Sequence, residues 1–377
     1  MSIKTLSKKM LAIVAAGAMT MGLAMPTSVF AAGGDTTTKI TKAYISKTFN
    51  TVVGKDETFS FKAEPVAVGN TANVTIPDIS FSNSDTGSTT KRVEVSFPKW
   101  PDAGKYEYTV TETAATPGIT DEEHQKMIMS RAEYTMDVYV TNGDSGLEIA
   151  NIIVNKTKDD KGTAATGKVD ISDTDKNGFN FTNTYVQEAG TGTDPITPDP
   201  DYTTYGSLNV SKTIDANNGT LDTAKQFDFT ATFTFPAGTD ATTLGGVKGN
   251  GAAITINQDG TYSFKLRTAE SMKFTGVPVG TKISVVESAT PNYKGSAAVV
   301  INGTTQDPVT ATKYDEALTV SDKSLGQKKN TVDVTNTYNY VPTTGIIMNT
   351  LPYVLMIALC GAALIAFVAF KRRRLQK

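Results

Sequence analysis

Six polar residues lie in strand-like stretches whose apolar neighbours indicate a buried face. Side chains of a β-strand alternate between its two faces, so residues two positions apart point the same way. Each of the six shares its face with aliphatic or aromatic residues. They are Lys47, Glu112 and Asn183 in the first half of the chain and Lys212, Glu287 and Asn336 in the second half. The sequence therefore predicts two matched sets of lysine, glutamate and asparagine, each inside a protein core.

A lysine, a glutamate and an asparagine in one core can form an intramolecular isopeptide bond. Burial favours the neutral form of an ionisable group, so it lowers the pKa of a lysine and raises the pKa of a glutamate. A neutral amine is a nucleophile, and a protonated carboxyl group can polarise the carboxamide and shuttle a proton. Because the fold holds the groups in contact, no external enzyme is needed, and ammonia leaves. The alternative is a buried salt bridge, or a lysine whose amine reaches the surface.

The segments that carry these residues occur in the same order in both halves of the chain. The repeated segments are lysine strands at 45–49 and 210–214, aromatic strands at 59–61 and 227–229, strands ending in glutamate at 108–112 and 283–287, and Thr-Asn-Thr-Tyr at 182–185 and 335–338. The lysine strand is thus the first of each half and the asparagine strand is the last. A covalent link between them would carry tension past the rest of the domain.

The remaining pattern between the termini is that of an all-β protein. Thr, Val, Tyr and Phe recur in short alternating runs separated by Asn, Gly and Asp, and no long helical periodicity is found there. Asn142-Gly143 is a hairpin signal after the alternating run 134–140, and Asp259-Gly260 predicts a hairpin between residues 254–256 and 262–266. Residues 187–204 are rich in Gly, Thr, Asp and Pro, which predicts a semi-extended linker between two domains.

Both ends of the chain read as targeting segments. Residues 1–31 combine three lysines, a short apolar run and Val-Phe-Ala, which predicts a signal peptide cleaved after Ala31. Residues 346–370 include a run of 20 apolar residues, enough to cross a bilayer core of ~30 Å. The basic tail 371–377 places that end in the cytoplasm. We therefore expect a membrane-spanning precursor whose main part is secreted.

A short motif precedes the apolar run. It reads Val341, Pro342, Thr343, Thr344 and Gly345. It resembles the LPXTG-like sorting signal of Gram-positive surface proteins, which a sortase cleaves between Thr and Gly. The usual first residue is Leu, and Val at this position resembles the variant signal of some streptococcal pilins. The alternative is a simple single-span anchor.

Charge and cysteine content exclude several classes of function. The chain has a net charge of −2, and its two terminal segments hold eight basic residues and no acid, so the part between them has a net charge of −10. Such a surface disfavours nucleic acid as a partner. The only cysteine, Cys360, lies in the apolar run, so the secreted part has no thiol nucleophile or thiolate metal site. His124 is the only histidine. We expect no metal and no cofactor.

A family resemblance joins these features. Residues 106–119, YEYTVTETAATPGI, resemble the pilin E-box, and residues 283–293, ISVVESATPNY, are a weaker copy. Over essentially its whole length the chain resembles the streptococcal T-antigen-type major (backbone) pilins. The resemblance implies two tandem immunoglobulin-like β-sandwich domains, each with an autocatalytic isopeptide bond. The implied sets are Lys47 with Asn183, assisted by Glu112, and Lys212 with Asn336, assisted by Glu287.

The function implied is that of a cell-wall-anchored pilus subunit rather than an enzyme. Its partners would be a sortase, identical subunits in a covalent head-to-tail fibre, accessory or tip pilins, and peptidoglycan. The expected divisions are a signal peptide (1–31), a first domain (32–186), a linker (187–204), a second domain (205–340), the sorting motif (341–345), the membrane span (346–370) and a basic tail (371–377).

One lysine must accept Thr344 of the neighbouring subunit if the protein is polymerised. We expect Lys176, seven residues before Asn183, because the aligned pilins carry their acceptor there. An odd spacing would turn it outward if the strand reaches that far. Lys99, in a segment like the Val-Tyr-Pro-Lys pilin motif, is the second choice. The alternatives are a wall-anchored adhesin that is never polymerised and, with less support, a surface hydrolase.

Overall fold

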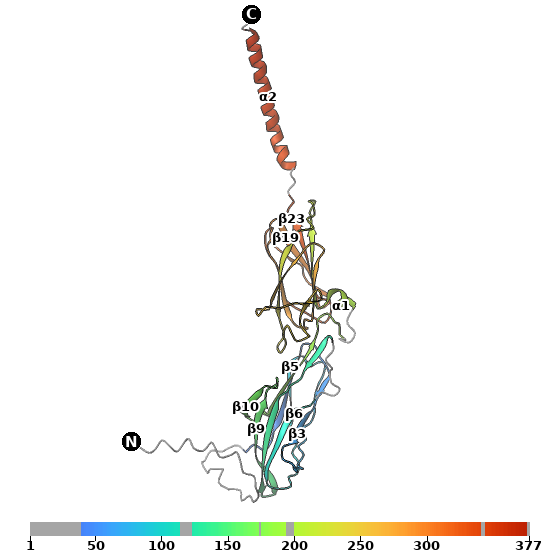
Figure 1. The fold of residues 1–377 in the computed structure, drawn as a ribbon, viewed down its shortest axis with the longest axis vertical. Coiled ribbons are helices and arrows are strands. Elements are labelled where there is room, and N and C mark those ends of the chain that lie inside the picture. Colours follow the sequence, from blue (N-terminus) through green and yellow to red (C-terminus); the bar gives the residue numbers. More distant parts are fainter. Residues whose placement is uncertain (1–38, 114–122, 173–174, 194–199, 341–343, 375–377) are drawn as a thin grey trace, which may run out of the picture. The chain divides into compact units, whose positions relative to one another are not determined.

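The structure is a computed structural model that describes residues 39–113, 123–172, 175–193, 200–340 and 344–374. The signal peptide expected at 1–31 and positions 341–343 of the sorting motif lie outside these ranges. Strands dominate the described part, in two successive sets (Figure 1). The predicted all-β fold with two tandem immunoglobulin-like β-sandwich domains is confirmed.

The first domain contains two main sheets with a hydrophobic core between them. One sheet has the order β5 (Gly87–Glu94), β1 (Tyr44–Thr51), β11 (Phe179–Gln187) and β7 (Gln125–Ile128). The other has the order β10 (Ala164–Val169), β9 (Gly146–Lys158), β8 (Glu133–Gly143), β6 (Gly104–Glu112) and β3 (Phe61–Pro65). A short pair, β2 (Glu57–Phe59) and β4 (Ile79–Phe81), adds aromatic side chains to the core.

The second domain repeats this plan with different edges. Its first sheet has the order β15 (Ala252–Ala253), β14 (Lys248–Gly249), β17 (Ser271–Thr275), β12 (Leu208–Asp215), β23 (Thr331–Tyr338), β19 (Tyr293–Ile301) and β20 (Thr304–Thr305), and β21 (Val309–Thr310) also pairs with β19. Its second sheet has the order β16 (Thr261–Leu266), β13 (Phe227–Thr234), β18 (Lys282–Glu287) and β22 (Leu318–Ser324). A separate buried cluster forms its core.

The first and last strands are parallel neighbours in both domains. β1 pairs with β11, and β12 pairs with β23. Parallel neighbours need a long crossover between them, and here nearly the whole domain forms that crossover. The two strands expected to carry the lysine and the asparagine are therefore hydrogen-bonded to each other in each domain.

The two hairpin signals are only partly right. β8 and β9 do form a hairpin, but Gly143 pairs with Gly146, so the turn lies at residues 144–145 rather than at Asn142-Gly143. Gly146 supplies the positive φ, 121°, that the connection needs. Gly260 does lie in a turn with φ 82°. However, the strand that follows it, β16, pairs with β13 and not with residues 254–256.

The segment expected to be a linker is not extended throughout. Residues 187–192 are buried, and Ala189 and Gly190 donate backbone hydrogen bonds to the carbonyls of Val277 and Gly326. Gly190 has φ 82°, and a Cβ there would lie 2.3 Å from the Gly206 carbonyl oxygen. Glycine thus lets the chain approach this closely, which the composition alone did not reveal. The short helix α1 (Pro200–Tyr205) follows.

The C-terminal apolar run forms one helix, α2 (Thr344–Arg374). Within it, Tyr353–Arg372 is long and apolar enough to cross a membrane, with a mean hydropathy of 2.6. The helix is compatible with the anchor expected at residues 346–370.

Candidate isopeptide sites

The first site is positioned by strands of both sheets of the first domain. In the parallel pair β1–β11, Lys47 lies opposite Phe181 and Asn183 lies opposite Phe49. Since residues two apart share a face, both polar side chains point into the core. Glu112 is the last residue of β6 in the facing sheet. Three strands distant in sequence therefore converge on one buried point.

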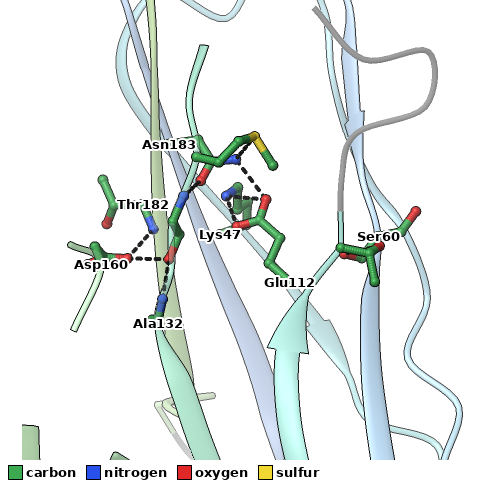
Figure 2. A network of polar contacts seen from close by, with 10 residues as sticks. Lys47, Ser60, Glu112, Ala132, Asp160, Thr182 and Asn183 are labelled. Atoms are coloured by element: carbon green, nitrogen blue, oxygen red, sulfur yellow. Dashed lines mark hydrogen bonds and ion pairs between the residues drawn. The ribbon is translucent and has the colours of Figure 1, made fainter. Parts of the chain in front are cut away.

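Glu112 contacts both partners at once. The Lys47 Nζ atom donates to Glu112 Oε1 at 2.7 Å and to Oε2 at 2.8 Å. The Asn183 Nδ2 atom donates to the same Oε1 at 2.7 Å (Figure 2). One carboxyl oxygen thus touches the amine that would attack and the amide nitrogen that would leave. A salt bridge alone does not require this third group.

Burial moves both ionisable groups toward their neutral forms. The Lys47 side chain has no exposed surface, and its Nζ atom lies 4.3 Å from the centre of the Phe59 ring. Burial lowers the pKa of Lys47 to about 8, against the opposing effect of Glu112. Burial raises the pKa of Glu112, against the opposing effect of Lys47. A neutral pair is the state in which the amine is nucleophilic.

The second site repeats the first. Lys212 lies opposite Val334 and Asn336 opposite Ile214, the same offset of two residues. Asn336 Nδ2 donates to Glu287 Oε1 at 2.7 Å, and Lys212 Nζ lies 3.1 Å from that oxygen. Burial lowers the pKa of Lys212 to about 8 and raises the pKa of Glu287. An aromatic ring again flanks the amine, since Nζ lies 4.3 Å from the Phe227 ring centre.

The two sites differ at the lysine amine and at the oxygen of the asparagine. Lys47 Nζ donates to both Glu112 oxygens, whereas Lys212 Nζ has no hydrogen-bond partner among the described residues. In the first domain the backbone N–H of Ser130 donates to Asn183 Oδ1 at 2.6 Å. In the second domain Asn336 Oδ1 is buried, and no hydrogen-bond partner is found for it in the part of the chain that the structure describes. Ser130 and its partner Asp160 were not predicted from the sequence. Both are ordinary loop residues in the sequence, and only the β8–β9 pairing brings them together.

The two lysines expected to accept Thr344 of a neighbouring subunit, Lys176 and Lys99, both lie on the surface. Lys176 is exposed in a turn with φ 52°, and β11 begins only at Phe179, so the odd-spacing argument does not apply to it. Gly178 ends the turn close to β1, where a Cβ would overlap the Tyr44 carbonyl oxygen. Lys99 is also exposed. Both lysines are therefore accessible.

The remaining predicted residues can be placed only in part. Thr344 and Gly345 are the first residues of α2, whereas Val341, Pro342 and Thr343 lie outside the described residues. Within the described ranges, no cluster of three or more His, Cys, Asp or Glu residues could hold a metal ion.

Comparison with known families matches the two domains separately. Residues 41–186 match the family described as Spy0128-like isopeptide containing domain. Residues 206–338 match a domain of unknown function, DUF7601. No curated protein matches the chain.

Comparison with solved structures finds pilus proteins. The major pilin from Streptococcus pyogenes is 19% identical, with a TM-score of 0.31, over 79% of this chain and 99% of that one. The S. pyogenes major pilin T3.2 is 20% identical, with a TM-score of 0.29, over 80% and 98%. The pilus-presented adhesin Spy0125 (Cpa) is 10% identical, with a TM-score of 0.27, over 78% and 99%.

Proposed function

Because residues 41–186 match the family described as Spy0128-like isopeptide containing domain, we propose that this protein is a backbone subunit of a Gram-positive pilus. The observation that carries the proposal is the buried Lys–Glu–Asn cluster that spans the first and last strands. It occurs in both domains with the same two-residue offset. A subunit that must transmit tension needs its terminal strands joined, and these clusters lie where a bond would join them.

The bond would form without a cofactor. The neutral Lys47 amine attacks Asn183 Cγ, and a new C–N bond forms while the carbonyl oxygen takes up negative charge. Glu112 donates a proton to Nδ2 and recovers one from Nζ, since its Oε1 touches both nitrogens. The Cγ–Nδ2 bond then breaks, and ammonia leaves. Lys212, Glu287 and Asn336 would react in the same way in the second domain.

Assembly would use the tail. The proposed precursor is exported by residues 1–31 and held in the membrane by 346–370, with the basic tail 371–377 inside. A sortase would cleave after Thr344 and join it to a lysine of the next subunit, and a final transfer would attach the fibre to peptidoglycan. The mature chain would then comprise domains at 32–186 and 205–340, connected by 187–204. Accessory or tip pilins would join the same fibre.

The proposed acceptor is Lys176. It is exposed, and it precedes β11, the strand that leads out of the first domain. It lies in a turn, outside the strands of the first domain. Lys99 is the second choice, on its exposure and on the motif around it.

The test is polymerisation in a Gram-positive host that carries the cognate pilus sortase. The wild-type chain should give a ladder of covalent high-mass species, and Lys176→Ala should remove it while Lys99→Ala leaves it intact. The reverse result would move the acceptor role to Lys99. Wall-attached monomers without any ladder, in the wild type and with active sortase, would replace the proposal with the non-polymerised adhesin.

A further inference from the structure

The carbonyl oxygen of Asn183 has a built hydrogen-bond donor, whereas the carbonyl oxygen of Asn336 has none among the described residues. We propose that the backbone N–H of Ser130 is an oxyanion donor for bond formation in the first domain, and that Asp160 is the positioning residue that holds it there. The inference rests on the proposed isopeptide chemistry. It also predicts that the two bonds of one subunit form at different rates.

The donor is held by a network that joins three elements (Figure 2). Asp160 Oδ1 accepts hydrogen bonds from Ser130 Oγ at 2.6 Å and from the Thr182 backbone N–H at 2.9 Å. Thr182 directly precedes Asn183 on β11. A single carboxylate therefore fixes the Ser130 loop, between β7 and β8, relative to the strand that carries the reacting carboxamide.

Two further hydrogen bonds hold the Ser130 loop in place. Ser130 Oγ accepts the backbone N–H of Ala132 at 3.2 Å, and the Asp160 carbonyl oxygen accepts the N–H of Arg131 at 2.9 Å. Ser130 is itself buried. The loop has no need to rearrange during reaction, and a donor that is fixed in advance stabilises developing charge most effectively.

The chemistry needs a donor at this oxygen. When Lys47 Nζ attacks Cγ, the carbonyl π electrons move onto Asn183 Oδ1, and when Nδ2 leaves as ammonia they return to re-form the carbonyl. The Ser130 N–H lies 2.6 Å from that oxygen before the reaction and gives up no proton. Its hydrogen bond strengthens only while the charge is present. In a water-excluded core one such donor changes a rate by roughly 10²–10³-fold.

The second domain provides the natural comparison. Asn336 Nδ2 donates to the carboxyl group as in the first domain, and Lys212 Nζ forms an ion pair with it at 3.1 Å. Among the described residues, however, neither Lys212 Nζ nor Asn336 Oδ1 has a hydrogen-bond partner. A Cβ at Gly295 would lie 3.1 Å from that oxygen, so the backbone of β19 lies close to it. The Lys212–Asn336 bond should therefore form more slowly than the Lys47–Asn183 bond.

Asp160 has a second effect that the test must separate. Its negative charge contributes, as the smallest of several causes, to the raised pKa of Glu112. Asp160→Asn retains an oxygen that can accept from Ser130 and Thr182 but removes the charge. Asp160→Ala removes both. Near-normal reaction in the asparagine variant and slow reaction in the alanine variant would identify a positioning role.

The experiment follows both bonds in the full chain. The chain is made by cell-free translation without detergent, collected as a precipitate and dissolved in denaturant, so that dilution into detergent micelles starts folding of both domains together. Samples are quenched in acid and digested, and mass spectrometry measures the cross-linked and linear peptides of each domain. Fluorescence of Trp100, the only tryptophan, reports folding of the first domain independently of the bond.

The decisive variant removes only the N–H. Glyceric acid, the α-hydroxy analogue of serine, incorporated at position 130 converts the amide between Met129 and that position into an ester and keeps Oγ, so the wild-type chain is its matched control. We expect the Lys47–Asn183 bond to form about 10²-fold more slowly in the ester than in the wild type. The Lys212–Asn336 rate should be the same in both and serves as the internal control.

Three results would overturn the inference. Equal Lys47–Asn183 rates in the ester and in the wild type, with normal Trp100 fluorescence, would show that the N–H does not act on the oxyanion. Wild-type rates in Asp160→Ala would remove its positioning role. Absence of both bonds in the wild-type chain would overturn the proposed isopeptide function and this inference with it. The first two results, in contrast, leave the proposed isopeptide function standing.

Discussion

Asn183 lies opposite Phe49, two residues beyond Lys47 on the neighbouring parallel strand, and Asn336 stands in the same relation to Lys212. An offset of two residues keeps both side chains on the core face and sets them diagonally across one strand spacing. An offset of one would turn one of them to the other face. The repeated offset is the arrangement that the proposed reaction between amine and carboxamide would require.

The first prediction concerns the mass of the protein. Residues 32–344, produced in a cytoplasm without sortase, should be lighter than the sequence mass by two ammonia molecules, because each buried cluster releases one. Glu112→Ala and Glu287→Ala should each restore one ammonia. Glu94→Ala, which removes an exposed carboxylate paired with Lys42, should leave the mass deficit unchanged. An intact mass equal to that of the unmodified sequence would contradict both proposed bonds.

The second prediction concerns stability. A bond between Lys212 and Asn336 closes almost the whole second domain into a loop, and long-loop disulfides offer a guide of roughly 3–5 kcal/mol. Asn336→Ala keeps the Lys212–Glu287 contact but cannot form the bond. It should lower the thermal midpoint of the second domain and expose that domain to trypsin, while the first domain stays protected.

The control for stability is Lys265→Ala, which removes an exposed ion pair with Asp228 on the same domain. Exposed pairs contribute little, so this variant should resist trypsin as the wild type does. Equal resistance of Asn336→Ala and Lys265→Ala would argue against a bond in the second domain.

The third prediction concerns pH. The reactive pair holds one proton, with Lys47 neutral and Glu112 protonated. Acid protonates the amine, and alkali removes the last proton, so the rate should be bell-shaped. Burial lowers the pKa of Lys47 to about 8, so the rate should fall as the pH rises through about 8 and the pair loses its proton. Burial raises the pKa of Glu112, so the rate should also fall as the pH drops below that raised pKa and the pair takes up a second proton.

The measurement is the initial rate of cross-linking during refolding across a pH series. The Lys212–Asn336 bond should show an alkaline limb at a similar pH, since burial also lowers the pKa of Lys212 to about 8. A rate that rises through pH 8 to a plateau would mean that only the amine titrates and that the glutamate is not the acid.

The fourth prediction concerns the junction between subunits. Sortase should cleave after Thr344 through an acyl intermediate on its own cysteine, so α2 and its basic end are lost from the fibre. Mass spectrometry of digested fibres should find Thr344 joined to a lysine side chain. Peptides that continue through Gly345 in mature fibres would show that the cleavage site is elsewhere.

The sequence predicted the fold class and the burial of the six polar residues because both depend on a period of two. The grouping of each lysine with its glutamate and asparagine came from the family resemblance. Lys47, Asn183 and Glu112 stand out as polar residues on apolar faces, and the structure buries all three. The resemblance to T-antigen-type pilins is confirmed by the family match over residues 41–186. These features are visible locally along the chain, without knowledge of which strands pair.

Features that depend on tertiary contacts were not predictable in this way. Ser130 and Asp160 meet only because β8 and β9 pair and return the chain to the end of β11. The turn after β8 lies two residues later than predicted, because Gly146 and not Gly143 adopts positive φ. Likewise, the composition of the linker did not show that residues 187–192 pack against the second domain.

The parallel pairing of first and last strands also determines how far a fibre can stretch. With both bonds in place, the only chain that a pulling force can straighten between them runs from Asn183 to Lys212, a separation of 29 residues. Fully straightened, that segment reaches ~100 Å at most. Unfolding of either sandwich adds no contour length beyond this. A pilus of such subunits would act as a tether of nearly fixed length, which transmits the drag of flowing liquid to its attachment points without absorbing it.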